Sequence, residues 1–320
     1  MITVQTSFGV NSANIPAVGT YKVAVLIANF EDEPDHITKN YTTTAEILMK
    51  QVERYFSKVS YEKLSVNVDV YYLNENISSQ FKICQDKDDN GNQTFREMQN
   101  AAKQTKRIAN NQDINTNQYR SIVIIAPFEN CRALGNMGGD TAYIPYPDQV
   151  NRGNIAHELL HNWGLGHADT LWCKDKVFPT HQHLKLEGGP SSSELADAET
   201  LYGSLGNYSD DCEWYQYGDP YSPMGGRPGH LNVVEKENLG WLAPSPLGRE
   251  NMPRQDNDIN YEYPQYDSWP KILTVTSSGI YEIKPLMNDN GIVALKIPRP
   301  GPDIGEPNFH NGRSGNLQDI

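Results

Sequence analysis

The chain has 320 residues, of which 38% are hydrophobic and 21% charged, and its formal net charge is −13. This length allows one large domain, or one large domain with a smaller one. The acidic balance argues against nucleic-acid binding through a basic surface. A membrane span needs about eighteen or more consecutive apolar residues, and the sequence contains no such run.

Apolar patterning predicts alternating strands and helices in the first half of the chain. In chain order, the predicted elements are a strand at 21–30, a helix at 43–58, a strand at 64–73, a helix at 95–110, a strand at 120–127, a short edge strand at 142–146 and a helix that begins near 151–154. This order predicts an α/β fold with a twisted, mostly parallel sheet, an antiparallel edge strand and helices packed on the sheet.

A segment before the second predicted helix matches the twelve-residue loop that binds calcium. The expected oxygen ligands are Asp86, Asp88, Asn90, the backbone carbonyl of Asn92, and Glu97 at the twelfth position. Gln93 stands where an aliphatic residue is usual, and residues 81–84 predict a strand where a calcium loop has a helix. A Ca²⁺ site and an Asx-rich turn that caps the following helix are therefore both retained as interpretations.

Four cysteines allow three disulfide connectivities, and the sequence alone does not choose among them. We expect Cys84–Cys131 together with Cys173–Cys212, because each pair would connect one half of the core. Buried thiols are the alternative. Disulfides would favour a secreted protein.

The stretch HELLHNWGLGH, from His157 to His167, carries three histidines at fixed offsets. A helix advances about 100° and 1.5 Å per residue, so His157 and His161 would lie roughly 40° apart and about 6 Å along the axis. Both imidazoles can then reach a single Zn²⁺. Glu158 would point beside the metal, where it could act as a general base on a metal-bound water.

The third histidine, His167, would lie about 15 Å from His157 on a continuous helix. It can become a ligand only if the chain reverses direction first. Gly164 is the residue where the helix could end in the left-handed conformation that glycine adopts without penalty. Three imidazoles would leave the fourth position of the zinc open, as in catalytic sites. An amphipathic helix with coincidental histidines is the alternative interpretation.

Beyond the histidine stretch the chain becomes rich in loop-forming residues. Residues 170–229 predict mostly loops, 231–239 a short helix, and 280–283 and 292–297 short strands. Residues 246–320 predict a small β-rich C-terminal part.

The pattern HExxHxxGxxH resembles the metzincin zinc endopeptidases, whose site also contains a methionine turn. The stretch YGDPYSPMG, from Tyr217 to Gly225, is similar to such a turn, with Met224 as its methionine. Together with Asn162 and the downstream Leu-Gly-Trp at 239–241, this turn is most similar to the gametolysin-like peptidases. Residues 55–61 also resemble that group and the immune-inhibitor-A-like group.

The resemblance implies a catalytic domain at 1–245, with an upper subdomain at about 20–166 and a lower one at about 167–245. It implies that Met224 packs under the histidines without ligating zinc, and that an extended peptide binds along the edge strand, expected within 138–146. The position that carries a metal-reaching tyrosine in some metzincins is Gly226 here. Tyr221 and His230 are candidates to stabilise the oxyanion instead.

These features predict a secreted, monomeric zinc endopeptidase that acts on extracellular proteins or glycoproteins through a zinc-bound water activated by Glu158. The alternative is a secreted binding or adhesion module with a structural or inactive zinc site. The presence of Glu158 argues against this alternative, because a retired site does not need the carboxylate.

Overall fold

The computed structural model describes residues 17–84, 96–168, 170–173, 212–215, 217–219, 221–225, 229–242, 269–275, 277 and 279–296. They form two compact units. The larger unit contains the described residues up to 165 and from 232 onwards, and the smaller unit contains those within 166–231. Among the helices of these residues, none is long and apolar enough to cross a membrane.

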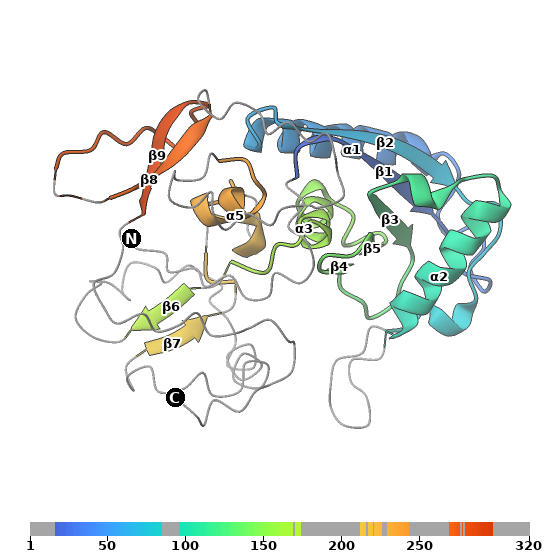
Figure 1. Cartoon of the computed structure of the whole chain (residues 1–320). Coiled ribbons are helices and arrows are strands. Elements are labelled where there is room, and N and C mark those ends of the chain that lie inside the picture. Colours follow the sequence, from blue (N-terminus) through green and yellow to red (C-terminus); the bar gives the residue numbers. More distant parts are fainter. Residues whose placement is uncertain are drawn as a thin grey trace. The chain divides into compact units, whose positions relative to one another are not determined.

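A five-stranded sheet forms the centre of the larger unit (Figure 1). Its strand order is β2-β1-β3-β5-β4, and the strands are β1 (Gly19–Ile27), β2 (Leu64–Tyr72), β3 (Ser121–Ala126), β4 (Leu134–Gly135) and β5 (Thr141–Pro145). β1 runs parallel to β2 and β3, β3 runs parallel to β5, and β4 is antiparallel to β5. The expected mixed α/β architecture with a mostly parallel sheet is therefore present.

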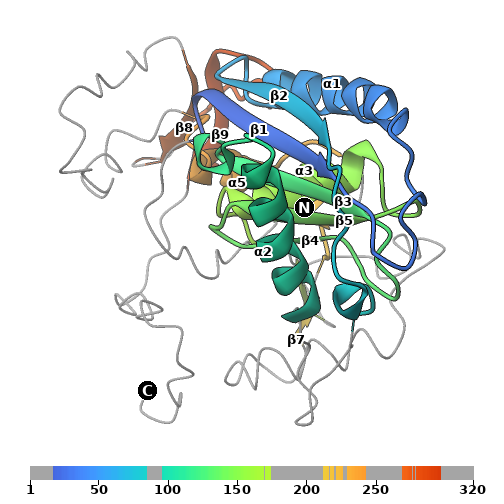
Figure 2. The same cartoon turned by 90° about the vertical axis from the view of Figure 1, so that its right-hand side faces the viewer.

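Three helices pack on this sheet (Figure 2): α1 (Tyr41–Val59), α2 (Arg96–Asn111) and α3 (Arg152–Asn162). The buried side of α2 shares one apolar cluster with Leu26 of β1 and Ile124 of β3. Successive side chains of a strand point to opposite faces of the sheet, so the neighbours of Leu26 and Ile124 face away from α2. On that face Trp163, directly after α3, contacts Phe56 of α1 and Tyr21 of β1, with ring centroids 4.5 and 5.5 Å apart.

The edge of the sheet differs from the prediction. Residues 142–146 were expected to form the edge strand, but β5 (Thr141–Pro145) is an inner strand that pairs on both sides. All five of its residues are buried, as an inner strand requires. The edge is the two-residue strand β4, which is too short to produce a periodic pattern in the sequence.

The loops that follow β1 and β3 are held together near one end of the sheet. The Lys82 ammonium lies within 3.2 Å of three carboxylates, those of Asp32, Glu33 and Glu129. These carboxylates raise the pKa of Lys82 above its usual value. Cys84 and Cys131 form a disulfide beside this cluster, in agreement with the expected pairing.

The segment before this disulfide is not the strand expected at 81–84. It contains a short 3-10 helix, η1 (Ser79–Phe81), followed by one isolated bridge between Ile83 and Glu129. The apolar residues at 81–84 are too few to form a full ladder.

The C-terminal part of the larger unit contains the helix α5 (Val233–Asn238) and two parallel strands, β8 (Pro270–Thr274) and β9 (Gly291–Lys296). The prediction of a strand at 280–283 is wrong: these residues form no strand, and Ile280 is fully exposed. The apolar residues Ile280, Tyr281 and Ile283 favoured a strand there. The partner of β9 is instead β8, which the sequence analysis missed.

The smaller unit contains an antiparallel pair, β6 (Thr170–Cys173) and β7 (Cys212–Tyr215). Its register places the backbone of Cys173 opposite that of Cys212. The side chains of these two cysteines lie outside the described residues, so the second expected disulfide stays a prediction.

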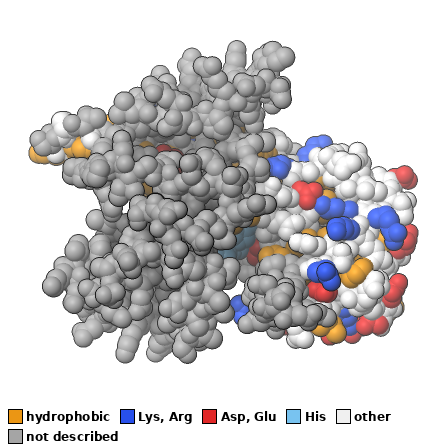
Figure 3. All heavy atoms as spheres, turned by 60° about the horizontal axis from the view of Figure 1, so that its bottom comes forward, with side chains coloured by type: hydrophobic (Ala, Val, Ile, Leu, Met, Phe, Trp, Pro, Cys, Tyr) orange, Lys and Arg blue, Asp and Glu red, His pale blue; other side chains and the backbone are white. Residues whose placement is uncertain are grey.

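Acidic and basic side chains are interspersed on the described part of the surface that Figure 3 shows.

One lysine of the larger unit is fully buried. Lys236, on α5, is 0% exposed, and its Nζ has no hydrogen-bond partner among the described residues. The Nζ lies 3.9 Å from the centre of the Tyr61 ring. The ammonium of Lys63 lies 4.8 Å from the centre of the same ring. Burial and the charge of Lys63 lower the pKa of Lys236 to about 7.

We expect Lys236→Met to stabilise the protein, by about 1–3 kcal/mol near pH 6, because an apolar side chain of similar length replaces a buried ammonium that has no hydrogen-bond partner among the described residues. The pKa of Lys236 is below its unfolded value of 10.5. The unfolded chain therefore binds more protons between about pH 7 and pH 10.5, and this lysine makes stability rise with pH in that window.

Urea unfolding at pH 6, 8 and 10 measures both effects. The gain from Lys236→Met should shrink as the pH rises, whereas Lys50→Met, at an exposed position of α1, should change stability little at any pH. A gain that does not vary with pH would contradict the explanation.

Candidate metal centre

The helix α3 begins with a side-chain cap. The side-chain oxygen of Asn151 accepts a hydrogen bond from the Asn154 backbone N–H at 2.9 Å. Such a cap satisfies one of the donors that a helix leaves open at its start. The buried residues Ile155 and Leu159 anchor the helix. His157 and His161 follow at a spacing of one helical turn, with His157 partly exposed and His161 buried.

The end of α3 is a Schellman motif centred on Gly164. The N–H of Gly164 donates to the His161 carbonyl at 2.9 Å, and the N–H of Leu165 donates to the Leu160 carbonyl at 3.0 Å. Gly164 has φ of +97°, in the left-handed region that side chains disfavour. The chain therefore leaves the helix axis three residues after His161, and His167 lies on the segment that turns back.

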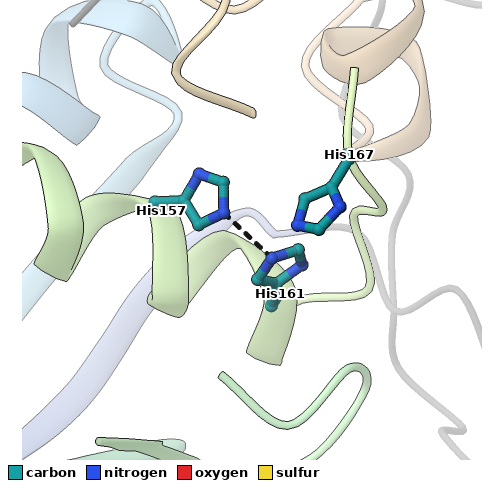
Figure 4. Close-up of side chains that lie close together, drawn as sticks. All are labelled: His157, His161 and His167. Carbon is teal, nitrogen blue, oxygen red and sulfur yellow. Dashed lines mark hydrogen bonds between the residues drawn. The ribbon is translucent and has the colours of Figure 1, made fainter. Parts of the chain in front are cut away.

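The side chains of His157, His161 and His167 converge (Figure 4). One ligand nitrogen from each lies within 4.8 Å of the other two. The Nε2 atoms of His157 and His161 are 3.0 Å apart. Two nitrogens bound to one tetrahedral Zn²⁺ at about 2.0–2.1 Å are roughly 3.3 Å apart. The spacing of the nitrogens is thus on the scale of metal coordination.

A backbone carbonyl determines which nitrogen of His161 carries its proton. The Nδ1 atom lies 2.7 Å from the Leu165 carbonyl oxygen. A carbonyl only accepts, so Nδ1 must be the donor. Burial and the neighbouring His157 lower the pKa of His161 to about 4, which keeps the ring neutral. Its Nε2 is then a lone-pair donor directed at the other two histidines, as a metal ligand must be.

The residues present fit a metal of the zinc type. Three imidazoles from one helix and the loop after it are borderline-soft nitrogen donors, which suit zinc better than calcium or magnesium. The carbonyl of Leu165 supplies the outer hydrogen bond that orients one ligand. Among the described residues, these three histidines are the cluster of three or more potential ligand side chains (His, Cys, Asp or Glu) that lie close enough together to hold a metal ion.

Glu158 is 5% exposed and follows the first histidine on the helix. Burial raises the pKa of its carboxyl to about 8, and a hydrogen bond from the Gly135 backbone N–H partly opposes this rise. A cation bound beside the carboxyl would lower the pKa further.

The edge of the sheet is fastened to this helix. A Cβ on Gly135 of β4 would lie 2.3 Å from the Glu158 carbonyl oxygen, so only glycine permits the contact. The Gly138 N–H donates to the His161 carbonyl at 2.9 Å. The side-chain amide of Asn162 donates to the carbonyls of Asn136 and Thr141, at 3.1 and 2.9 Å. The sequence analysis assigned no role to Gly135, and it cited Asn162 only for its family resemblance.

The proposed methionine turn lies in the smaller unit, next to the segment that follows His167. The N–H of Ala168 donates to the Met224 carbonyl at 2.9 Å, and the N–H of Asp219 donates to the Ala168 carbonyl at 3.0 Å. Met224 is fully buried within the 3-10 helix η3 (Pro223–Gly225). A Cβ on Gly225 would lie 1.8 Å from the Asp219 carbonyl oxygen, so the turn requires glycine there.

The two oxyanion candidates lie on neighbouring backbone segments. Tyr221 is 64% exposed, and its backbone N–H donates to the Asp219 carboxylate at 2.9 Å. The backbone N–H of His230 donates to the Tyr221 carbonyl, also at 2.9 Å. Neither contact tests a catalytic role, which stays a prediction.

Of the expected calcium ligands, only Glu97 lies within the described residues. Asp86, Asp88, Asn90 and Asn92 lie outside them. Glu97 lies in the first turn of α2, and its Oε2 is buried without a hydrogen-bond partner among the described residues. A Ca²⁺ site at this loop therefore stays a prediction.

Comparison with known proteins adds no assignment, because no family model and no curated protein matches this chain.

We expect Gly164→Ala to lower the free energy of unfolding by about 1–2 kcal/mol, because alanine disfavours a left-handed backbone. A Cβ at this position meets no atom within 4 Å, so the cost is conformational and not steric. Asparagine tolerates this backbone better, and Gly164→Asn should cost less. Urea unfolding of both variants measures the difference. Equal stability of Gly164→Ala and wild type would contradict the strained turn.

Proposed function

We propose that this protein is a zinc-dependent endopeptidase of the metzincin type, most similar to the gametolysin-like peptidases. One observation carries the proposal: three histidine nitrogens converge within 4.8 Å of one another, and the residue after the first histidine is a buried glutamate. Metal ligands and a carboxyl with a raised pKa, brought together by one helix and its return loop, are typical of a hydrolytic centre.

The roles of the side chains follow from their chemistry. Zn²⁺ bound by His157, His161 and His167 would lower the pKa of water and polarise a carbonyl group. Glu158 accepts a proton from the attacking water and returns it to the leaving amine. A positioned acid–base group of this kind contributes a factor of about 10²–10⁴ to the rate. Burial raises the pKa of the Glu158 carboxyl in the metal-free chain, and a cation bound beside it would lower that pKa again.

The substrate of this proposed enzyme is an extended segment of a protein or glycoprotein. In the described sheet β4 and β2 each have a strand neighbour on one side only, and β4 is the edge that contacts α3, so we place the extended peptide along β4. The hydrogen bond from Gly135 to Glu158 couples this edge to the proposed base. A peptide on β4 would therefore be placed in a defined register relative to the site.

The remaining proposals concern stability and location. The Cys84–Cys131 disulfide supports a secreted protein, because disulfides persist in oxidising compartments. We propose from the sequence pattern of residues 86–97 that this loop binds a structural Ca²⁺. We propose that the enzyme acts as a monomer.

Metal analysis and digestion of casein or gelatin by the full chain test the proposed function. We expect one zinc per chain and proteolysis that a chelator abolishes. Glu158→Gln should retain zinc and lose about 10²–10⁴-fold in rate, because the amide cannot accept the proton.

Glu46→Gln, at an exposed position of α1, is the matched control and should keep full activity. Full proteolysis by Glu158→Gln, or a wild-type chain that binds no zinc, would overturn the proposal. A chain that binds zinc but cleaves neither substrate would favour the binding-module alternative.

A further inference from the structure

We propose that Tyr217 is a positioning residue for the third metal ligand, which its ring holds in place by stacking. This inference rests on the proposed function, because it assumes that His167 binds zinc. It names a residue outside the histidine pattern on which the affinity of the site for zinc depends.

The first observation is the contact itself. The rings of Tyr217 and His167 have centroids 3.8 Å apart and are inclined by 34°. The phenol ring therefore lies over the imidazole and limits rotation of His167 about its side-chain bonds. A loop ligand benefits from such support, because an unsupported imidazole must lose its rotamer freedom when the metal binds.

The second observation is the backbone of Tyr217. Its φ is +58°, a left-handed conformation that non-glycine residues rarely adopt. Such conformations persist only where surrounding contacts enforce them, and they gather at functional sites. Glycine would adopt this backbone without strain. The presence of tyrosine in a position suited to glycine indicates that its ring has a role that offsets the strain.

The third observation explains how the ring is kept in register. Two residues after Tyr217, the N–H of Asp219 donates to the carbonyl of Ala168, which directly follows His167. The N–H of Ala168 donates in turn to the Met224 carbonyl. The segments that carry the two rings are thus joined by backbone hydrogen bonds. Tyr217 is 41% exposed, so we infer that these backbone hydrogen bonds, and not burial of its ring, keep the ring over His167.

A distinct signature follows from the combination of strain and stacking. Tyr217→Gly removes the ring and also relieves the backbone strain. If Tyr217 positions His167, this variant should bind zinc more weakly although the metal-free protein is no less stable. A tyrosine with a merely structural role would give the opposite result, with lower stability and unchanged zinc affinity.

The experiment measures the zinc dissociation constant by competition with a chromophoric chelator, and the urea unfolding of the metal-free chain. We expect Tyr217→Gly to raise the dissociation constant about tenfold, as is typical when a partner of a metal ligand is lost. Tyr217→Phe keeps the ring and should stay within about twofold of wild type. Tyr217→Asn also lacks the ring, and asparagine tolerates the left-handed backbone. Its dissociation constant should likewise rise about tenfold, so it tests the inference even if the glycine variant folds poorly.

The matched control is Asp113→Gly, which relieves a φ of +61° at an exposed position of the larger unit. It should leave the zinc dissociation constant unchanged. Wild-type affinity in both Tyr217→Gly and Tyr217→Asn would overturn the inference while leaving the proposed function intact. An equal loss in Tyr217→Phe and Tyr217→Gly would overturn stacking as the cause. A wild-type chain that binds no zinc would overturn the proposed function itself.

Discussion

The reversal of the chain at Gly164 is the constraint on which the site depends. A helix can present two histidines one turn apart, but a residue ten positions beyond the first is carried away along the axis. The hydrogen bonds that Gly164 and Leu165 donate back to α3 end the helix and turn the chain at the same point. The left-handed backbone of Gly164 allows both hydrogen bonds to form at the same time. Without this turn, His167 could not approach the other imidazoles.

A second constraint connects the helix to the sheet. The contact between Gly135 and the Glu158 carbonyl allows no side chain, and Asn162 holds the connection between β4 and β5 by two hydrogen bonds. The edge strand and the helix that carries Glu158 are therefore in direct contact. If a peptide is added to β4, its position relative to Glu158 is decided by the packing of the free protein and not by a rearrangement on binding.

Local patterns predicted much of the fold. The apolar runs of β1 and β3, the helical periodicity of α1 and α2, and the start of α3 appear within a few residues of their expected bounds. The errors occur where local pattern is weak. The segment at 142–146 was assigned to the edge because its true outer neighbour, β4, has only two residues. The apolar residues at 280–283 suggested a strand, but a strand requires a partner, and β9 pairs with β8 instead.

The sequence by itself indicated the candidate metal ligands, because two histidines one helical turn apart and a glycine before the third allow all three to meet once the chain reverses. It also indicated the buried neighbour Glu158. Only the tertiary structure decided the tautomer of His161, the contact of Gly135 with α3, and the stacking of Tyr217 on His167. The latter two contacts join residues far apart in the chain, and the first depends on where the turn after α3 places one carbonyl. The hydrophobic periodicity of the sequence carries no information about such contacts, because they depend on how the elements pack and not on the order of residues within each element.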